Sequence, residues 1–413
     1  MKILCLSNLY PPNVVGGYER LCFDVTSALV ERGHRAMVLT SDYGGNTGDY
    51  PGQEIRRELK LLVGDGSIYR PFSGSREEKA AIDAGNVAAF ERALRDFGPD
   101  IVFVWNLYFL DASLLRAIQD RQVPNVLLLT DNWLIAFLNG MYWQRYFAEN
   151  VLGGPRSFLS SLRLRLIGLF KKQKPLAIDG RAIFASRFME NLYRGAGFRF
   201  SGSTVIYHGI PGGSAGSKNL DFRRQLLQKG ELRLLFAGRV VEIKGVHTAL
   251  EAVPRIAAAL PNLRVRLTVL GDRLDPAYDD RLNGLVDRLG LAECVEFVPA
   301  VSEDALEALF SGYDVYLFPS LYEPFSLTLI HALRAGIPTV ASDAGGNVEI
   351  VRHRQSGMIF RRSDPRSLAE QVIELARSDS LRLALAKSGA ETGRQYTFAG
   401  MVEQVQGYLM GSR

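Results

Sequence analysis

Short apolar, β-rich segments alternate with helical patterns along the first half of this chain, and that alternation limits the folds open to it. The β-rich segments read KILCLSN, RAMVLTS, DIVFVWN, PNVLLLTD, RAIFAS and TVIYHG. Apolar residues at helical spacing predict a helix from Tyr18 to Arg32, ended by Gly33. Strands that alternate with helices form parallel sheets with helices on both faces. The first half therefore predicts a doubly wound α/β domain.

The same pattern restarts after residues 211–217, PGGSAGS, whose composition is that of a flexible linker. The later β-rich segments read LRLLFAG, LRVRLTVLG, CVEFVP, DVYLFP and TVAS. We therefore predict two Rossmann-like doubly wound domains that face a central cleft, over residues 1–210 and 211–395. Residues 396–413 read as one more amphipathic helix, which we expect to cross back to the first domain.

Composition narrows the class of protein. The 413 residues are 47% apolar with a mean hydropathy of +0.01, as in a globular protein. The apolar start of the chain is too short for a signal peptide, and the longest apolar stretch, 101–110, is interrupted by Asn106. Cys5, Cys22 and Cys294 show no paired spacing. We expect a cytoplasmic protein that does not span a membrane.

The net charge of +5 and the pI near 9.0 suit a partner that carries phosphates. This excess is small for a nucleic-acid-binding protein of such length, and aromatic and basic residues do not interleave as they do in RNA-binding proteins. The charge therefore favours a phosphate-bearing small molecule over nucleic acid.

Residues 319–336, PSLYEPFSLTLIHALRAG, place an acidic residue where a buried strand passes into a helix. The segment DVYLFP before it is short and apolar, and the helical stripe after it stops at Gly336. Open α/β sheets bind ligands at the carboxyl ends of their strands. Glu323 is therefore a candidate ligand contact near a helix N-terminus.

A second strand-to-helix junction carries two cations. In FAGRVVEIKG, Arg239 and Lys244 stand five positions apart beside glycines. The guanidinium fork of an arginine and the point charge of a lysine together suit a diphosphate. Either side chain could instead be an ordinary solvated charge. The flanking glycines and the acid downstream favour the diphosphate.

The loop NLYPPNVVGG ends in Gly16 and Gly17 at the start of a helix. The two glycines could bring backbone amides close to a phosphate, with help from the helix dipole, or could form a plain turn. The dinucleotide fingerprint G-x-G-x-x-G is absent from this loop. Its absence disfavours a nicotinamide or flavin enzyme.

Several of these segments together resemble one known family. GRVVEIKG followed by EPFSLTLIHALRAGIPTVASDAGGNVEIV resembles family 4 of the retaining glycosyltransferases, which have the GT-B fold. The double glycine, RAIFASRFMENLYRGAG, VIYHGI and SGMIFRRSDPRSLAEQVIEL follow the usual order of that family, so the resemblance spans nearly the whole chain. It implies an acceptor domain over 1–210 and a nucleotide-sugar donor domain over 211–395.

The resemblance also implies roles for individual side chains. Arg239 and Lys244 would hold the donor pyrophosphate, and Glu323 would bind the donor sugar. Gly16 and Gly17 would contribute amides to the pyrophosphate. Fixed cations and amides can stabilise the charge that develops on a departing nucleoside diphosphate. We therefore expect Arg239 and Lys244 to contribute most to the rate.

The start of the helix after Glu323 completes the implied donor site. Sugar and phosphate contacts would be shared by the backbone amides of Phe325, Ser326 and Leu327. Eight positions after Glu323, the family commonly has a second Glu that binds the ribose hydroxyls, and this chain has His331. A neutral imidazole accepts one hydrogen bond, whereas a carboxylate accepts a pair. His331 is either a rearranged ribose contact or a packed helix residue.

The acceptor domain departs from the family at Thr130-Asp131, where many relatives carry His-Asp. The lost histidine would have contacted the sugar, and Thr130 offers a smaller contact. Asp131 remains as a hydrogen-bonding group for the acceptor or the sugar. The alternative is that Asp131 caps the helix that follows.

No metal is expected at the site. The chain has no D-x-D pair, and its five histidines lack ligand spacing. Arg239 and Lys244 can take the place of a metal at the diphosphate. We predict metal-independent transfer with no cofactor other than the nucleotide-sugar substrate.

Residues 156–174, RSFLSSLRLRLIGLFKKQK, are basic and amphipathic. Such a helix can lie on the anionic inner face of a membrane. It can equally dock on a sheet with a solvated basic rim. The segment is therefore a candidate peripheral membrane contact.

The sequence predicts a retaining glycosyltransferase that moves a hexose-type sugar from a nucleoside diphosphate sugar to a hydroxyl acceptor. The acceptor could be a glycan, a lipid-linked sugar or a small-molecule aglycone. An alternative interpretation is a non-catalytic nucleotide-sugar-binding or partner subunit of a glycosyltransferase complex. It is suggested by His331 in place of the family's second Glu and by Thr130 in place of the family's histidine.

Overall fold

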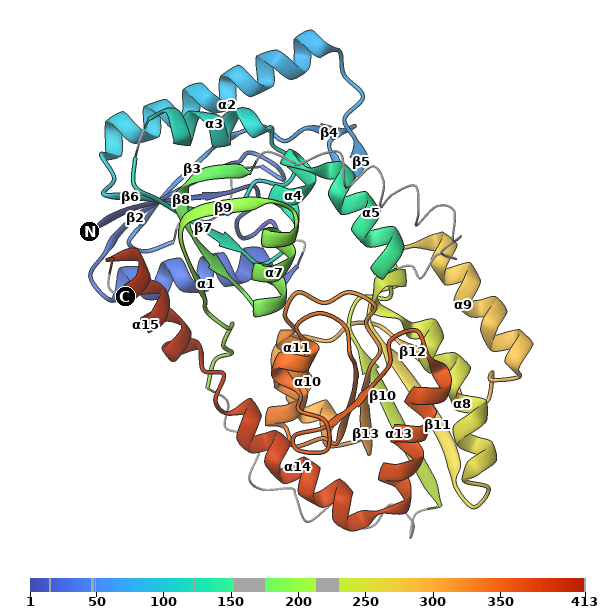
Figure 1. Ribbon diagram of the computed structural model, residues 1–413. Coiled ribbons are helices and arrows are strands. Elements are labelled where there is room, and N and C mark those ends of the chain that lie inside the picture. The colour runs from blue at the N-terminus through green and yellow to red at the C-terminus, as the bar shows by residue number, and fades with distance from the viewer. Residues whose placement is uncertain are drawn as a thin grey trace. The chain divides into compact units, whose positions relative to one another are not determined.

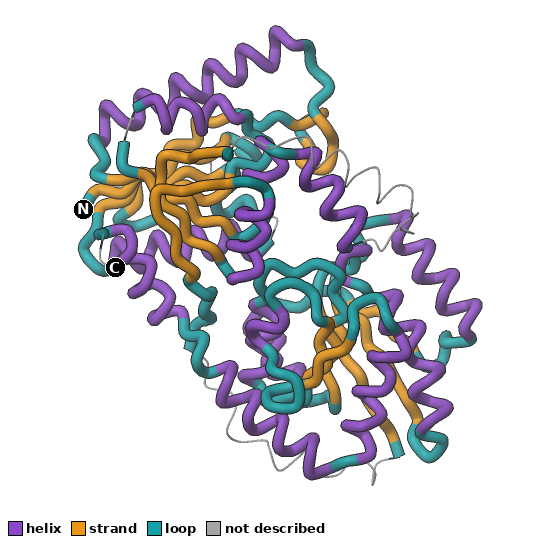
Figure 2. The backbone as a smooth tube through the Cα atoms, in the orientation of Figure 1, coloured by secondary structure: helices purple, strands orange, loops and turns teal. Residues whose placement is uncertain are grey.

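The computed structural model describes residues 1–14, 16–45, 48, 50–121, 123–151, 175–212 and 230–411. These residues form two compact units. The first holds most of the chain up to Tyr207 together with residues from Met401 onward, and the second holds His208–Gly400. Each unit is a parallel sheet with helices packed against it, as the strands and helices in Figure 2 show.

The sheet of the first unit has seven strands among the described residues, in the order β3-β2-β1-β6-β7-β8-β9. Its strands are β1 (Lys2–Ser7), β2 (Arg35–Ser41), β3 (Gln53–Leu59), β6 (Ile101–Asn106), β7 (Asn125–Leu129), β8 (Leu176–Phe184) and β9 (Phe198–Val205). A separate antiparallel hairpin joins β4 (Val63–Gly64) and β5 (Ser67–Pro71). The strand order reverses between β1 and β6, which makes that pair the topological switch point of the sheet.

Helices cover both faces of this sheet, with α2 and α3 on one side and α1 and α15 on the other (Figure 1). The helices are α1 (Gly17–Glu31), α2 (Arg76–Phe97), α3 (Ala112–Asp120), α4 (Trp133–Leu138), α5 (Gly140–Asn150), α7 (Arg187–Gly195) and α15 (Phe398–Leu409). Because both faces are covered, β1 and β6 are apolar along almost their whole length rather than alternating.

The sheet of the second unit has six described strands, in the order β12-β11-β10-β13-β14-β15. They are β10 (Glu231–Ala237), β11 (Arg264–Leu270), β12 (Val295–Val298), β13 (Val315–Phe318), β14 (Thr339–Ser342) and β15 (Met358–Phe360). Their pairings are parallel, and the order reverses between β10 and β13. This second switch point lies where Arg239, Lys244 and Glu323 leave their strands.

The helices of the second unit bury its apolar core. They are α8 (Val246–Ala259), α9 (Pro276–Leu289), α10 (Glu303–Phe310), α11 (Leu327–Arg334), α12 (Asn347–Ile350), α13 (Pro365–Arg377) and α14 (Asp379–Gly393), with a 3-10 turn at Glu242–Lys244. Helix α8 packs along α13 and against β11, so that Leu250, Leu267 and Val372 are fully buried or nearly so. Both predicted doubly wound domains are confirmed, because each sheet is parallel and reverses its strand order once.

Local signals account for where several helices begin and end. Ser75 and Glu78 form a reciprocal capping box at the start of α2, and Gly98 in the left-handed conformation ends it. Helix α9 begins with Asp275 as its cap and Pro276 in its first position. Such caps satisfy backbone groups that a helix end leaves without partners.

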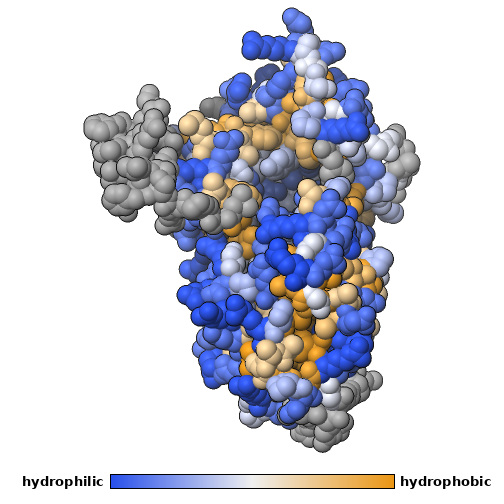
Figure 3. All heavy atoms as spheres, turned by 90° about the vertical axis from the view of Figure 1, so that its right-hand side faces the viewer, coloured by the Kyte–Doolittle hydropathy of each residue, from blue (hydrophilic) through white to orange (hydrophobic). Residues whose placement is uncertain are grey.

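On the face shown in Figure 3, hydrophilic residues cover most of the described surface, and hydrophobic residues gather in smaller patches. Within the described residues, the helices are all too short or too polar to cross a bilayer. The predicted membrane segment, 156–174, lies outside the described residues.

Candidate functional site

Glu323 lies at the carboxyl edge of the second sheet, in the loop between β13 and α11. The residue is buried, with 5% of its surface exposed. Its Oε2 accepts a hydrogen bond of 2.6 Å from Nζ of Lys244 and one of 3.3 Å from Oγ of Ser320. Glu323 and Lys244 thus form a largely buried ion pair between the ends of β10 and β13.

Two loops come close together to make this pair. The amide of Leu321 donates a 2.7 Å hydrogen bond to the carbonyl of Ile243, one residue before Lys244. Gly245 has a positive φ of 69°, and a Cβ there would collide with the carbonyl oxygen of Pro319. The glycine that the sequence places beside Lys244 is therefore needed for the close approach of the two loops.

A third loop supports Glu323 from the end of β14. The amide of Gly346 donates a 2.8 Å hydrogen bond to the carbonyl of Glu323. A Cβ on Gly346 would collide with the carbonyl oxygen of Pro324. The backbone of Glu323 is thus held by a loop that only a glycine allows to come so near.

The start of α11 is also fixed in place. Oγ of Ser326 accepts a 3.1 Å hydrogen bond from the amide of Leu329, so Ser326 is the N-cap of the helix that begins at Leu327. The ring of Phe325 packs against His208 and Tyr396, with ring centres 5.6 and 5.9 Å apart. The structure thus brings Glu323 and Lys244 together and holds Phe325, Ser326 and Leu327 next to them in the chain.

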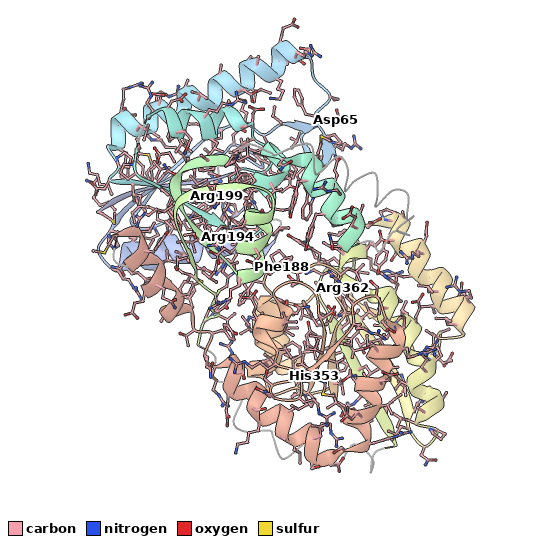
Figure 4. The ribbon with its side chains drawn as sticks, viewed as in Figure 1. Asp65, Phe188, Arg194, Arg199, His353 and Arg362 are labelled. Atoms are coloured by element: carbon pink, nitrogen blue, oxygen red, sulfur yellow. The ribbon has the colours of Figure 1, made fainter. Side chains whose placement is uncertain are left out.

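Two further cations belong to the same edge of the sheet. Arg239, just beyond β10, is exposed, and its guanidinium has no hydrogen-bond or ion-pair partner in the described part of the chain. Arg362 follows β15 (Figure 4) and donates a hydrogen bond of 3.5 Å to the carbonyl of Leu321, with Asp343 at 4.0 Å. Sequence reasoning missed Arg362. Its position directly after a β-rich segment is the signal that could have identified it.

His331 lies inside α11 and is 4% exposed. Its backbone carbonyl accepts the hydrogen bond that ends the helix at Ala335. This burial agrees with a packed helix residue, and a ribose contact stays a prediction.

In the first unit, the amide of Gly16 already has a partner. It donates a 3.0 Å hydrogen bond to Oε2 of Glu19, a residue only 5% exposed in the first turn of α1. Gly17, which begins α1, is exposed. Sequence reasoning missed Glu19, although an acid three residues after a helix cap is a recognisable signal. Gly17 is therefore the better placed of the two glycines for an anion.

Asp131 follows β7 at the carboxyl edge of the first sheet. Its Oδ1 accepts a 2.9 Å hydrogen bond from the amide of Trp133, the first residue of α4, so the capping contact is present. Its backbone carbonyl accepts a 2.9 Å hydrogen bond from the hydroxyl of Tyr193. Burial raises the pKa of the Asp131 carboxyl to about 6, the Trp133 amide opposes that rise, and the nearby Glu19 adds to it. A carboxyl with such a pKa can change its charge near neutral pH.

Among the described residues, no group of three or more His, Cys, Asp or Glu side chains is placed to hold a metal ion. Metal-independent transfer stays a prediction, because this observation concerns only the protein's own ligands.

Two family models match the chain in succession. The model described as Glycosyltransferase Family 4 matches residues 15–211, and the model described as Glycosyl transferases group 1 matches residues 217–392. An uncharacterized glycosyltransferase of Methanocaldococcus jannaschii is 26% identical over 380 residues, which cover 89% of this chain and 87% of that protein. A glycogen synthase of Mycobacterium tuberculosis is 26% identical over 387 residues, 90% of this chain and 85% of its own.

Solved structures give the same fold. Sucrose-phosphate synthase from Thermosynechococcus elongatus superposes with a TM-score of 0.69 at 19% identity and covers 99% of this chain and 98% of its own. The Anabaena protein HepE, in a complex with UDP and glucose, superposes with a TM-score of 0.68 at 19% identity over the whole of both chains.

Proposed function

The chain is a glycosyltransferase of family 4 with the GT-B fold, and on that basis we propose that it moves a hexose-type sugar from a nucleoside diphosphate sugar to a hydroxyl acceptor, with retention and without a metal ion. The observation that carries the proposal is the ion pair of Lys244 and Glu323 at the switch point between β10 and β13. A cation can bind the diphosphate of such a donor, and a carboxylate beside it can accept hydrogen bonds from the hydroxyls of the sugar.

The carboxylate of Glu323 would accept hydrogen bonds from hydroxyls of the donor sugar, and Lys244 would contact the diphosphate next to it. Arg239, exposed and without a protein partner among the described residues, would complete the diphosphate contacts. The amides of Phe325, Ser326 and Leu327 at the start of α11 would share them. Lys244, Glu323 and the start of α11 are held by protein contacts before the donor arrives, so little reorganisation of these groups opposes the developing charge.

In the transfer itself, the bond between C1 of the sugar and the diphosphate oxygen breaks, and its electron pair stays on the diphosphate. The acceptor oxygen bonds to C1 on the same face, and the hydroxyl proton passes to the departing diphosphate. Lys244 and Arg239 would stabilise the leaving group. Gly17 would add an amide to it, with Gly16 held by Glu19.

Relatives support the donor class more firmly than the acceptor. The Anabaena protein HepE was solved with UDP and glucose, and also with UDP-glucose, which supports a nucleoside diphosphate sugar as donor here. The relatives differ in the acceptor, because one is named glycogen synthase and another, 32% identical over 183 residues, is named D-inositol 3-phosphate glycosyltransferase. Asp131 is proposed to hydrogen-bond the acceptor or the sugar, and His331 to lie near the ribose.

The proposal is tested by incubating the protein with UDP-, ADP- and GDP-linked glucose and mannose. Release of the nucleoside diphosphate and the shift of the melting temperature are measured for each donor. We expect one donor to raise the melting temperature and to be turned over equally well with and without EDTA. Loss of turnover in EDTA would contradict metal independence, and donor binding without turnover in any acceptor mixture would favour the non-catalytic rival.

A matched pair of arginines tests the diphosphate contact. Arg239→Ala is expected to weaken donor binding about tenfold or more. Arg264→Ala removes another exposed arginine of the same unit, at the first position of β11 and so at the opposite edge of the sheet. Equal donor binding in both variants would show that Arg239 does not hold the diphosphate.

The cytoplasmic location and the peripheral membrane contact through residues 156–174 are proposals that rest on sequence alone. Flotation with vesicles of phosphatidylcholine, with and without phosphatidylglycerol, tests the second. Binding that needs the anionic lipid is expected, and its absence would leave the segment as an ordinary basic region.

A further inference from the structure

The carboxylate of Glu323 has two protein donors, and both bind the same oxygen. Nζ of Lys244 donates a hydrogen bond of 2.6 Å to Oε2, and Oγ of Ser320 donates one of 3.3 Å to the same atom. Oε1 has no hydrogen-bond partner in the described part of the chain. It is also not one of the buried polar atoms without a partner, so it is open to solvent. The protein therefore occupies one oxygen of this carboxylate and leaves the other for a ligand.

The two donors constrain the carboxylate in different ways. An ammonium group is a compact charge that attracts either carboxylate oxygen, so Lys244 supplies charge but little direction. The last torsion of a glutamate side chain has a broad energy minimum, so the plane of the carboxylate can turn. A serine hydroxyl has a single hydrogen, which must point at the oxygen that it binds. Ser320 is therefore the contact that decides which oxygen of Glu323 faces the protein and which faces solvent.

Ser320 is itself held by the end of the neighbouring strand, β14. Oγ of Ser342 donates a 2.5 Å hydrogen bond to the carbonyl of Ser320. Nδ2 of Asn347 donates hydrogen bonds of 3.2 Å to the carbonyl and to Oγ of Ser342. Because the one hydrogen of the Ser342 hydroxyl goes to Ser320, its oxygen can accept from the amide of Asn347. The hydrogen bonds thus run in one direction, from Asn347 through Ser342 to Ser320.

This series of polar side chains is enclosed in the protein. Ser320, Ser342 and Asn347 are all fully buried. Oδ1 of Asn347 has no hydrogen-bond partner among the described residues, and a buried oxygen without a partner destabilises a fold. Stability alone is therefore a poor explanation for three polar residues at these positions. Their common feature is that the series leads to Ser320, whose hydroxyl ends on Oε2 of Glu323.

We propose that Ser320 is a positioning residue for recognition of the donor sugar. Held by Ser342 and Asn347, its hydroxyl keeps Oε2 of Glu323 turned to the protein and presents Oε1 to the hydroxyls of the sugar. Lys244 can then turn toward the diphosphate while Ser320 still holds the carboxylate. An acceptor oxygen that is fixed in place distinguishes epimeric sugars, whose hydroxyls differ only in direction. The inference rests on the proposed function and adds the residues that set its selectivity among donor sugars.

Ser320→Ala tests the role directly, because it removes the hydroxyl and leaves Lys244 in place. Donors with glucose, galactose or mannose on the same nucleoside diphosphate are compared by steady-state kinetics. We expect kcat/KM for the preferred donor to fall about tenfold, and its preference over the epimers to fall by a similar factor. Affinity for the free nucleoside diphosphate, measured by isothermal titration, should change by less than about twofold. Unchanged selectivity overturns the proposal, and so does an equal loss of affinity for the free nucleoside diphosphate.

Thr339→Val is the matched control for the loss of a buried hydroxyl. Thr339 is buried at the first position of β14, and its Oγ1 donates a 2.9 Å hydrogen bond to the carbonyl of Ile337. It belongs to the same strand as Ser342 but lies at the opposite edge of the sheet. The variant should lower the melting temperature, as Ser320→Ala does, and leave donor selectivity unchanged. An equal loss of selectivity in Thr339→Val would overturn the proposal.

Two further variants keep the proposal testable if Ser320→Ala folds poorly. Ser342→Ala retains the hydroxyl of Ser320 but releases its carbonyl, so selectivity should fall in the same direction by about threefold. Ser320→Cys keeps a weaker hydrogen-bond donor of similar size and should retain more selectivity than Ser320→Ala. Full selectivity in Ser342→Ala, or a cysteine variant no better than the alanine variant, would contradict the proposal.

The parent protein separates this inference from the function on which it rests. If the parent binds and turns over a nucleotide-sugar while Ser320→Ala has the same donor selectivity, the inference fails and the proposed function stands. If no nucleotide-sugar shifts the melting temperature of the parent, the proposed function fails, and the inference fails with it.

Discussion

The carboxyl edges of the two sheets differ in chemistry although the sheets share one topology. In the second unit, the carboxylate of Glu323 has a cation at 2.6 Å. Arg239 follows β10, the neighbour of β13, and Arg362 follows β15, two strands from β13 on the other side. In the first unit, Asp131 accepts a hydrogen bond from the amide of Trp133, Glu19 accepts one from the amide of Gly16, and the buried hydroxyl of Thr130 has no hydrogen-bond partner among the described residues. The doubly wound sheet supplies the place for a ligand, and the loop residues decide which ligand fits.

The two edges also differ in how they are held. Glycines in the second unit let three loops approach so closely that Gly245 and Gly346 have no room for a side chain. In the first unit, the hydroxyl of Tyr18 ties α1 to β6 and β7. One edge is fixed by the absence of side chains and the other by the presence of one. Substitutions at these two edges should therefore change activity and stability in different ways.

The largest effect is expected from Lys244→Met. It removes a cation from the proposed diphosphate site and leaves Glu323, with 7% of its side chain exposed, as a buried charge without its cation. We expect kcat/KM to fall about 100-fold or more, since fixed charges at a leaving group are worth that much. We expect the free energy of unfolding to fall by about 3 kcal/mol. Urea unfolding and steady-state kinetics measure the two.

Lys387→Met is the control for this change, because Lys387 is an exposed lysine of α14. It should alter neither quantity. If Lys244→Met also left the donor KM and the stability unchanged, the ion pair of Lys244 and Glu323 would contribute neither to donor binding nor to folding.

Gly346→Ala should act on the same edge through the backbone. The added Cβ would collide with the carbonyl oxygen of Pro324 and displace the loop that carries Glu323. We expect donor affinity to fall about tenfold through misplacement of that carboxylate and stability to fall by about 2 kcal/mol from overpacking. Isothermal titration with the selected donor and thermal unfolding measure both effects.

Gly284→Ala provides the comparison within the same unit. Gly284 lies inside α9, and a Cβ there would meet no atom within 4 Å. Alanine favours a helix interior over glycine, so this variant should be as stable as the parent or slightly more so. If Gly346→Ala and Gly284→Ala had the same donor affinity and the same stability, displacement of the loop beside Glu323 would affect neither quantity.

Asp131→Asn tests the edge of the first sheet through pH. Because the pKa of Asp131 is raised from 3.8 to about 6 in the folded protein, the folded state binds its proton more tightly than the unfolded state does. Stability should therefore fall as pH rises from about 4 to about 6, and the asparagine variant should lack that component. Activity should rise over the same range in the parent, because the ionised carboxylate is the better acceptor of a hydroxyl hydrogen bond.

Thermal unfolding and kcat/KM measured from pH 4 to pH 8 check this prediction. In Asp131→Asn we expect activity at pH 7 to be about fivefold lower and its dependence on pH near 6 to disappear. An unchanged pH profile would mean that Asp131 serves only to cap α4.

The smallest effect is expected from Thr130→Val. The hydroxyl of Thr130 is buried without a protein partner among the described residues, so its removal should not destabilise the fold and should change the unfolding free energy by less than about 1 kcal/mol. The KM for the acceptor should nevertheless rise a few-fold, because one hydrogen bond to it is lost. A clear loss of stability would mean that the hydroxyl has an unrecognised structural role, and the first edge would then resemble the second.

Much of the fold could be predicted from the sequence. Continuous apolar, β-branched segments such as Ile101–Asn106 are typical of strands buried on both faces, and the helices between them favour parallel pairing. Glu323 and Lys244 could each be placed near a strand end, since both lie in the loop that follows a short β-rich segment. The family resemblance depended on the same segments, and the family models match them.

The contacts made by these residues could not be predicted. Lys244 was expected to face a diphosphate, and the structure pairs it with Glu323, a residue 79 positions away in the chain. Gly16 was expected to offer its amide to a phosphate, and Glu19 accepts a hydrogen bond from that amide. The first contact does not follow from spacing, because it depends on which strands are neighbours. The second is signalled by the spacing of an acid three residues after a helix cap, but it also depends on the rotamer that the buried glutamate adopts.

The sequence by itself determined the number of domains, their parallel sheets and the family, because apolar periodicity, turn residues and motif order are local properties of the chain. Only the tertiary structure decided which side chains share an edge. The reversal of strand order between β10 and β13 brings Lys244 to Glu323, and the hydrogen bonds of Tyr18 hold α1 at the ends of β6 and β7, beside Asp131. The different chemistry of the two edges arises from burial and proximity, and both exist only once the chain is folded.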